Sequence, residues 1–282
     1  MLAIFQRKLF KNALMILGWG LGLALLGYFL FDIYESLFVM DADVQQIMEA
    51  FPDEVLAFFG GEIDVFDPEG FLHLEFFSYV QIILGLVVVS GATSLIVKIE
   101  EQGTLELILA QPISRSAVFW SKLAALVVTL ILILTIIWGG FALGLAGTDS
   151  FDLDQGQLIR PFVSLFAVLM FFLGLALLFS MILPTSGSAS MVTNLVLIAS
   201  FFITSLAQIY DRLEPLNRLS PLRYYQGGRA LSGINTEHLL ILLGGSVVFI
   251  ALAWFLFEKR DLRFGGTGWL RLAFKRKGNE AG

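Results

Sequence analysis

The charged residues with the most informative spacing lie in one segment, residues 98–122. It opens with an acidic pair, Glu100 and Glu101, and it is flanked by runs 76–97 and 123–146, which contain no Asp, Glu, Lys or Arg. Each flanking run is long enough to span a membrane, since about 20 helical residues cross the roughly 30 Å core of a bilayer. The charged segment therefore lies at a membrane surface, where its side chains are suited to binding another protein rather than to catalysis.

Within this segment the residue types predict a short amphipathic helix over residues 104–111. Thr104 is suited to cap its N-terminus, and Glu106 lies in the first turn, where a negative charge favours the helix dipole. Pro112 ends the helix, and Ser114 can cap the span that follows. Its apolar face is narrow and consists of Leu105, Ile108 and Leu109. The alternative is an ordinary connecting loop whose charged face is solvated.

The chain contains no motif that would give it a reaction of its own. It has no G-x-x-x-x-G-K-[ST] phosphate loop, no H-E-x-x-H and no G-x-S-x-G. It also has no cysteine and only two histidines, His73 and His238, which leaves little material for a metal site. We therefore expect neither an enzyme nor a bound cofactor or metal. An enzyme acting on lipid would need an intramembrane nucleophile or metal ligands, and no credible set is present.

Composition places the chain in a membrane. Of the 282 residues 57% are hydrophobic and 15% are charged, and the mean hydropathy is +0.82. A soluble protein of this length cannot bury so much apolar surface. The sequence predicts an all-α polytopic membrane protein, a single transmembrane domain over residues 1–282. Its six spans are expected at about 13–33, 76–97, 123–146, 161–183, 190–210 and 239–257.

The distribution of basic residues predicts the orientation of these spans. The N-terminus, the 98–122 segment and the tail 258–282 together hold 13 of the 18 Lys and Arg. The loop 35–75 holds eleven acidic residues and no Lys or Arg. By the positive-inside rule both termini are cytoplasmic, in an integral protein of the plasma membrane. The basic tail is suited to anionic lipid headgroups.

Three further patterns predict local structure. The loop 35–75 has apolar residues at helical spacing, which is typical of short helices on the outer membrane surface, and Asp67-Pro68-Glu69-Gly70 marks a turn before the second span. The loop 211–237 carries Tyr and Arg residues suited to an interfacial or re-entrant piece. Gly18 and Gly22, four residues apart in the first span, are typical of close helix packing.

Residues 100–115, EEQGTLELILAQPISR, resemble the signature of ABC-2 type transporter permeases. The acidic first loop, the six spans, the 220–225 stretch SPLRYY and a basic amphipathic N-terminus are also similar to that family. The resemblance implies a type V exporter-like architecture, in which the coupling segment 98–117 forms a cytoplasmic helix that sits in a groove of a separate ATP-binding subunit. The residues implied in this coupling are Glu100, Glu101, Gly103, Thr104, Leu105, Glu106, Ile108, Pro112 and Arg115.

The fifth expected span has a polar stripe. Ser190, Asn194, Leu197, Phe201, Thr204 and Gln208 follow at steps of four and three and share one helix face. Hydrogen-bonding groups that face lipid are left unsatisfied, so this face points into protein or a wet cavity. Helix–helix hydrogen bonding is one interpretation. The other, implied by the resemblance, is a translocation path between two protomers, to which Ser78, Gln81 and Gly85 of the second span would contribute.

The resemblance also implies the partners and the activity. It indicates a homodimer, or a heterodimer with a similar permease, that carries two copies of a separate ATPase subunit. ATP and Mg would be bound by that subunit, and nucleic acid is not expected as a partner. The uncharged, modestly polar path suggests export of an amphipathic small molecule such as a drug, an antibiotic or a lipid. The alternative is a non-transporting membrane scaffold or regulator that has kept the permease fold.

Overall fold

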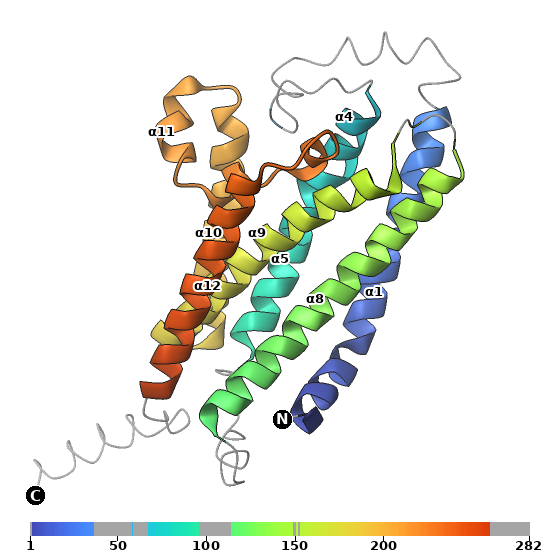
Figure 1. The fold of residues 1–282 in the computed structure, drawn as a ribbon. Coiled ribbons are helices and arrows are strands. Elements are labelled where there is room, and N and C mark those ends of the chain that lie inside the picture. Colours follow the sequence, from blue (N-terminus) through green and yellow to red (C-terminus); the bar gives the residue numbers. More distant parts are fainter. Residues whose placement is uncertain are drawn as a thin grey trace, which may run out of the picture.

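The computed structural model describes residues 2–36, 58, 67–95, 114–148, 151 and 153–259. These residues form a bundle of six long helices (Figure 1). The long helices are α1 (Leu2–Tyr34), α5 (Ser78–Thr93), α8 (Arg115–Ala146), α9 (Gln155–Ile182), α10 (Ser186–Ala207) and α12 (Thr236–Lys259). The shorter elements are α4 (Pro68–Leu72), the π-helical segment η2 (His73–Phe77), η3 (Asp211–Leu213), α11 (Glu214–Asn217), η4 (Pro221–Tyr224) and η5 (Gly227–Ala230).

The six membrane-length helices confirm the predicted number of spans and the all-α fold. Each is apolar enough to cross a bilayer, and the second of them runs from Pro68 to Thr93 through α4, η2 and α5. The turn predicted at Asp67-Pro68 is therefore wrong. Asp67 is the N-cap and Pro68 occupies the first helical turn, where proline is favoured because its φ is already helical and its missing N–H is not needed.

The start of α8 is set by a capping residue. Ser114 caps α8 as predicted, since its Oγ accepts a hydrogen bond from the backbone N–H of Ala117 at 3.2 Å. The basic N-terminal segment is not a separate helix, because α1 continues without a break from Leu2 to Tyr34. The predicted helix at residues 104–111 and most of the loop 35–75 lie outside the described residues.

The bundle is built around α9, which packs against α5, α8, α10 and α12, while α1 packs along α8 at one side (Figure 1). The contact between α1 and α8 is close because glycines lie in it. A Cβ at Gly140 would come within 2.2 Å of the backbone oxygen of Ala24, and one at Gly27 within 2.1 Å of the ring of Phe141. Gly18 and Gly22, by contrast, have no atom within 4 Å of a Cβ, so they do not pack against another described helix of this chain.

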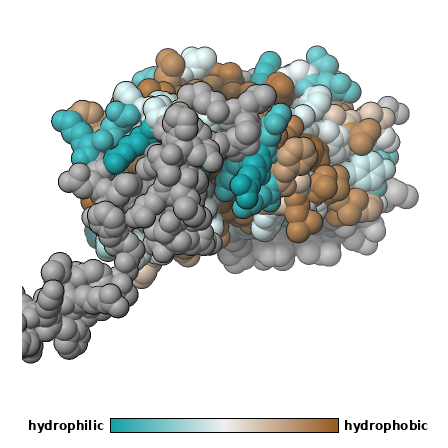
Figure 2. All heavy atoms as spheres, turned by 90° about the horizontal axis from the view of Figure 1, so that it is seen from below, coloured by the Kyte–Doolittle hydropathy of each residue, from teal (hydrophilic) through white to brown (hydrophobic). Residues whose placement is uncertain are grey.

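We call the end of the bundle where α1 begins and α12 ends the terminal end, and the opposite end the far end (Figure 1). Viewed onto the terminal end, hydrophilic residues lie in separate groups with hydrophobic residues between and beside them (Figure 2). Polar contacts join the helices here. Lys122 Nζ donates to the carbonyl oxygen of Leu95 at 3.3 Å, and the hydroxyls of Thr93 and Ser190 lie 2.6 Å apart.

At the far end, residues 208–235 fold into short helical pieces, which we call the far-end hairpin. This agrees with the prediction of a short piece in this loop. Pro221 and Leu222 of η4 are buried, as are Gly227 and Gly228 of η5. The hairpin packs onto the start of the second span and onto α9.

Candidate functional site

The second and fifth spans face each other along their length. At the terminal end the hydroxyl contact between Thr93 and Ser190 joins α5 to α10. Near the middle, Gly85 lies against Leu197, because a Cβ at Gly85 would come within 2.7 Å of Leu197 Cδ2. The stripe read from the sequence therefore points toward α5 at two levels.

Toward the far end these two helices diverge around a polar cavity of about 270 Å³. Four of the residues named from the sequence line it: Ser78, Gln81, Thr204 and Gln208. Ser190, Leu197 and Gly85 belong to the contacts described above, and Asn194 and Phe201 do not line the cavity either. Asn194 lies one helical turn nearer the terminal end than the Leu197 contact, and Phe201 contributes indirectly, since its ring lies 5.9 Å from the ring of the cavity residue Phe58.

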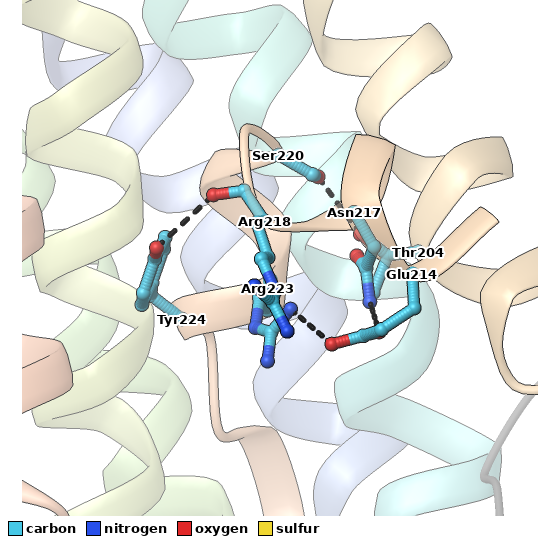
Figure 3. Close-up of polar contacts among 7 residues, drawn as sticks. All are labelled: Thr204, Glu214, Asn217, Arg218, Ser220, Arg223 and Tyr224. Atoms are coloured by element: carbon cyan, nitrogen blue, oxygen red, sulfur yellow. Dashed lines mark hydrogen bonds and ion pairs between the residues drawn. The ribbon is translucent and has the colours of Figure 1, made fainter. Parts of the chain in front are cut away.

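The far-end hairpin contributes a polar network to the wall of the cavity (Figure 3). Arg223 forms an ion pair with Glu214, and Asn217 Nδ2 donates to the other oxygen of the same carboxylate at 3.3 Å. The hydroxyls of Thr204 and Ser220 lie 2.8 Å apart, which fixes the hairpin to the end of α10. These contacts hold a charged, hydrogen-bonding cover over the polar faces of α5 and α10.

The cavity wall contains two buried acceptor atoms without a hydrogen-bond partner among the described residues, Gln81 Oε1 and Asn217 Oδ1. Gln81 Nε2 donates to the backbone carbonyl oxygen of Ser78, and Asn217 Nδ2 donates to a carboxylate oxygen of Glu214. These bonds fix the orientation of each amide, and its oxygen is left to accept. An unpaired buried acceptor costs about 1–3 kcal/mol. The site is therefore suited to a ligand group that donates hydrogen bonds, such as a hydroxyl or an ammonium.

Below the hairpin, backbone carbonyls of the π-helical segment η2 accept hydrogen bonds from side chains. Ser78 Oγ donates to the carbonyl oxygen of His73 at 2.7 Å, and Tyr225 Oη donates to that of Phe77 at 3.1 Å. The backbone N–H of Gly228 donates to His73 Nδ1 at 3.0 Å. Such π segments are frequent at functional sites, and here the segment binds the hairpin that covers the cavity.

Two glycines allow this contact. Gly227 has a φ of 52°, which non-glycine residues rarely adopt. A Cβ at Gly228 would come within 2.6 Å of His73 Cβ. Sequence reasoning missed this docking site; the adjacent Gly227-Gly228 pair was the signal that could have pointed to it.

The hairpin side chains have shifted ionisation. The hydrogen bond from Arg223, supported by one from Asn217, lowers the pKa of Glu214 from its ordinary value of 4.5. Burial raises the pKa of Tyr225 well above its usual range, so its hydroxyl stays protonated and continues to donate to Phe77. At neutral pH the hairpin therefore carries an ionised Glu214 and a neutral Tyr225.

Of the residues assigned to coupling from the sequence, the structure describes Arg115 alone, in the first turn of α8. The others, from Glu100 to Pro112, lie outside the described residues. The two ends that flank them are described, and they meet at the contact between Lys122 and the carbonyl oxygen of Leu95. Among the described residues no group of His, Cys, Asp and Glu is arranged to hold a metal ion.

The described residues thus form a bundle of six membrane-length helices with a polar cavity between two of them. The family described as ABC-2 family transporter protein matches this chain over residues 14–262, from the first span to the end of the sixth. The chain therefore belongs to the ABC-2 family of transporters and is an integral membrane protein. A search of the curated proteins found no match.

Proposed function

We propose that this chain is the membrane subunit of an ATP-driven exporter, and that it moves an amphipathic small molecule out of the cytoplasm with a separate ATPase subunit. Membership of the ABC-2 family over residues 14–262 carries the proposal. Family permeases generally act with an ATPase subunit, and no phosphate-loop motif occurs in this sequence. Two such ATPase subunits would act on a pair of permeases, two copies of this chain or this chain with a similar one.

The translocation path is proposed to run between α5 and α10. Support comes from the polar cavity at the far end, which Ser78, Gln81, Thr204 and Gln208 line. Two buried acceptor oxygens there favour a substrate with a hydroxyl or ammonium donor. The closely packed contact of Gly85 with Leu197 is apolar, so a substrate that passed between α5 and α10 would meet an apolar stretch there.

Coupling is proposed to pass through residues 98–117 at the terminal end, which would be cytoplasmic. Support comes from the signature in residues 100–115 and from the described contacts on either side of it. Lys122 joins α8 to the end of α5, and Thr93 joins α5 to α10. A partner that moves the segment would therefore act on both helices that line the path.

Affinity purification of the tagged protein in mild detergent, followed by mass spectrometry, tests this function. We expect a phosphate-loop ATPase at about one copy per permease, whose ATP hydrolysis rises with a transported amphiphile. A permease oligomer that retains no ATPase in several detergents and in native-lipid particles would contradict the exporter and favour the scaffold alternative.

A further inference from the structure

The wall of the far-end cavity includes His73, whose ring presents a hydrogen-bond donor. The backbone N–H of Gly228 donates to His73 Nδ1 at 3.0 Å, so this nitrogen carries no proton. A neutral imidazole in which Nδ1 accepts has its proton on Nε2. His73 lines the cavity, is 9% exposed, and makes no hydrogen bond through Nε2 with a described residue. It therefore offers the cavity an N–H group.

The far-end hairpin holds the ring in this orientation. A Cβ at Gly227 would come within 2.8 Å of His73 Nδ1 and 2.9 Å of Cε1, so the glycine backbone lies directly against this edge of the ring. A ring flipped by 180° would place a carbon against the N–H of the buried Gly228 and leave that group unpaired. The contact that docks the hairpin therefore also fixes which ring nitrogen carries the proton.

Three further buried side chains of the wall have hydrogen-bonding capacity left over. Gln81 and Asn217 each present an amide oxygen without a partner among the described residues. Ser205, 7% exposed, presents a hydroxyl that can donate or accept. These groups belong to the second span, the hairpin and α10, so one small group cannot reach all of them. The wall is suited to a ligand headgroup with several polar groups.

The combination of a donor with two acceptors selects among ligand chemistries. An ammonium group only donates, so it would leave the N–H of His73 unpaired. A carboxylate or a phosphate with no proton only accepts, so it would leave the oxygens of Gln81 and Asn217 unpaired. A hydroxyl donates and accepts, and several hydroxyls on one headgroup can satisfy all these groups together.

The charges and the size of the cavity agree with a neutral headgroup. Arg223 is paired with Glu214, and Arg229 also has an interaction partner, so the charged groups of the wall are already engaged. The volume of about 270 Å³ is slightly below the roughly 300–1,000 Å³ of sites that enclose a drug-sized ligand. The cavity therefore suits the polar end of an amphiphile rather than the whole molecule.

We infer that the far-end cavity binds a neutral headgroup with several hydroxyls, as in a polyol or a sugar, and that His73 Nε2 donates to one of its oxygens. This narrows the choice between hydroxyl and ammonium that the acceptor oxygens alone leave open. The inference rests on the proposed function for the place of the cavity on a translocation path. Binding itself requires neither transport nor an ATPase subunit.

Binding of two soluble probes of equal chain length, hexyl glucoside and hexyltrimethylammonium, to the full-length protein in lipid nanodiscs tests the inference. We expect tighter binding of the glucoside. His73→Asn should weaken it about five-fold, the factor for one neutral hydrogen bond, and leave the ammonium probe unaffected. Asn can still accept from Gly228 through Oδ1 but has no group in the place of Nε2, so the hairpin should stay resistant to protease.

The matched control is His238→Asn, the same substitution at a position that does not line the cavity, and it should bind both probes like the wild type. Equal or tighter binding of the ammonium probe by the wild type would overturn the inference. So would an equal loss of both probes in His73→Asn, because that would show a general change of the cavity rather than a lost donor.

Nitrogen-15 NMR of the wild-type protein tests the donor without a substitution at His73. The chain has two histidines, and His238→Asn assigns their ring signals. We expect the proton of His73 on Nε2, and a shift of the Nε2 signal on addition of hexyl glucoside. A proton on Nδ1, or no response to the glucoside, would overturn the inference. If the response is seen but no ATPase partner is found, the exporter fails and the headgroup site stands; the opposite results would remove the headgroup site alone.

Discussion

At the scale of single residues, Gln81 concentrates the chemistry of the far-end cavity. It is 7% exposed, and its amide nitrogen donates to the backbone carbonyl oxygen of Ser78. Its amide oxygen has no partner among the described residues. Water or a ligand donor must compensate for that oxygen, since a buried acceptor without one is costly. A substitution of Gln81 can therefore distinguish a path for molecules that donate hydrogen bonds from a contact that only bonds one helix to another.

Gln81→Leu should lower transport of a donor-bearing amphiphile while leaving the fold intact. Loss of one neutral hydrogen bond of about 1 kcal/mol corresponds to an increase of about five-fold in KM. An analogue with its hydroxyl methylated should show a smaller change. Transport into vesicles measures both, and Gln155→Leu, exposed at the start of α9, is the matched control. An equal response of the two substrates in Gln81→Leu would contradict the proposed acceptor role.

The ion pair between Glu214 and Arg223 predicts a pH-dependent far-end hairpin. Because its folded-state pKa is lowered from 4.5, Glu214 stabilises the hairpin above that value. The contribution is lost as pH falls through the lowered pKa. The protection of residues 211–225 against hydrogen exchange, relative to the intrinsic rate at each pH, should therefore fall below about pH 4.5. Glu214→Gln should show faster exchange already at pH 7 and a flatter profile; an unchanged acid step in this variant would assign the step to another group.

At the scale of elements, close approach rather than side-chain bulk positions the helices. Glycines allow α1 to lie against α8, and others allow the hairpin to lie against η2. Near each contact lies another glycine that faces open space. Gly139 precedes Gly140 in α8, and Gly233 lies in the same hairpin as Gly228. The chain thus supplies its own controls for each contact.

Gly140→Ala should separate α1 from α8. Its Cβ would meet the backbone of Ala24 at 2.2 Å, and a backbone atom cannot turn aside as a side chain can. Overpacking of this kind costs about 1–3 kcal/mol. We expect a clear fall in the apparent melting temperature of the detergent-purified protein. Gly139→Ala, with nothing within 4 Å, should leave it unchanged; an equal fall in both would show that helix propensity or expression, not this contact, is responsible.

Gly228→Ala should detach the far-end hairpin without unfolding the bundle. Its Cβ would lie 2.6 Å from His73 Cβ and 2.8 Å from His73 Cα, and the hydrogen bond to His73 Nδ1 would be lost with the displacement. Protease sensitivity of the hairpin should rise while the six spans stay protected. Gly233→Ala in the same hairpin has open space around it and should behave as the wild type. A resistant hairpin in Gly228→Ala would contradict the docking role of this glycine.

The sequence could predict what depends on composition and local period. Long apolar runs define the six spans, and the four-and-three spacing from Ser190 to Gln208 places polar residues on the face of α10 that meets α5. It could not predict which glycines lie in a contact, because Gly18 and Gly140 differ only in what the partner helix places beside them. Nor could it predict the bond between Gly228 and His73, 155 residues apart, since no local pattern encodes it.

At the scale of the whole molecule, the two ends of the bundle have different designs. The far end closes a polar cavity under a hydrogen-bonded hairpin, and the terminal end joins α5, α8 and α10 through Lys122, Thr93 and Ser190. Residues 98–117 begin and end at these joined helices. In the coupling proposed above, a force applied there would reach the far-end cavity through α5 and α10.

Reversing the charge of the acidic pair, Glu100→Lys with Glu101→Lys, should separate ATP hydrolysis from transport. Both residues lie in the surface segment assigned to coupling, so the spans should fold and insert normally. We expect transport to fall at least ten-fold while the ATPase subunit loses its stimulation by substrate, as measured in vesicles that contain both subunits. Glu237→Lys, exposed at the far end, controls for the change in net charge. Normal coupling in the double variant at normal expression would remove residues 98–117 as the docking segment and leave Arg115 and the helix ends around it to be tested next.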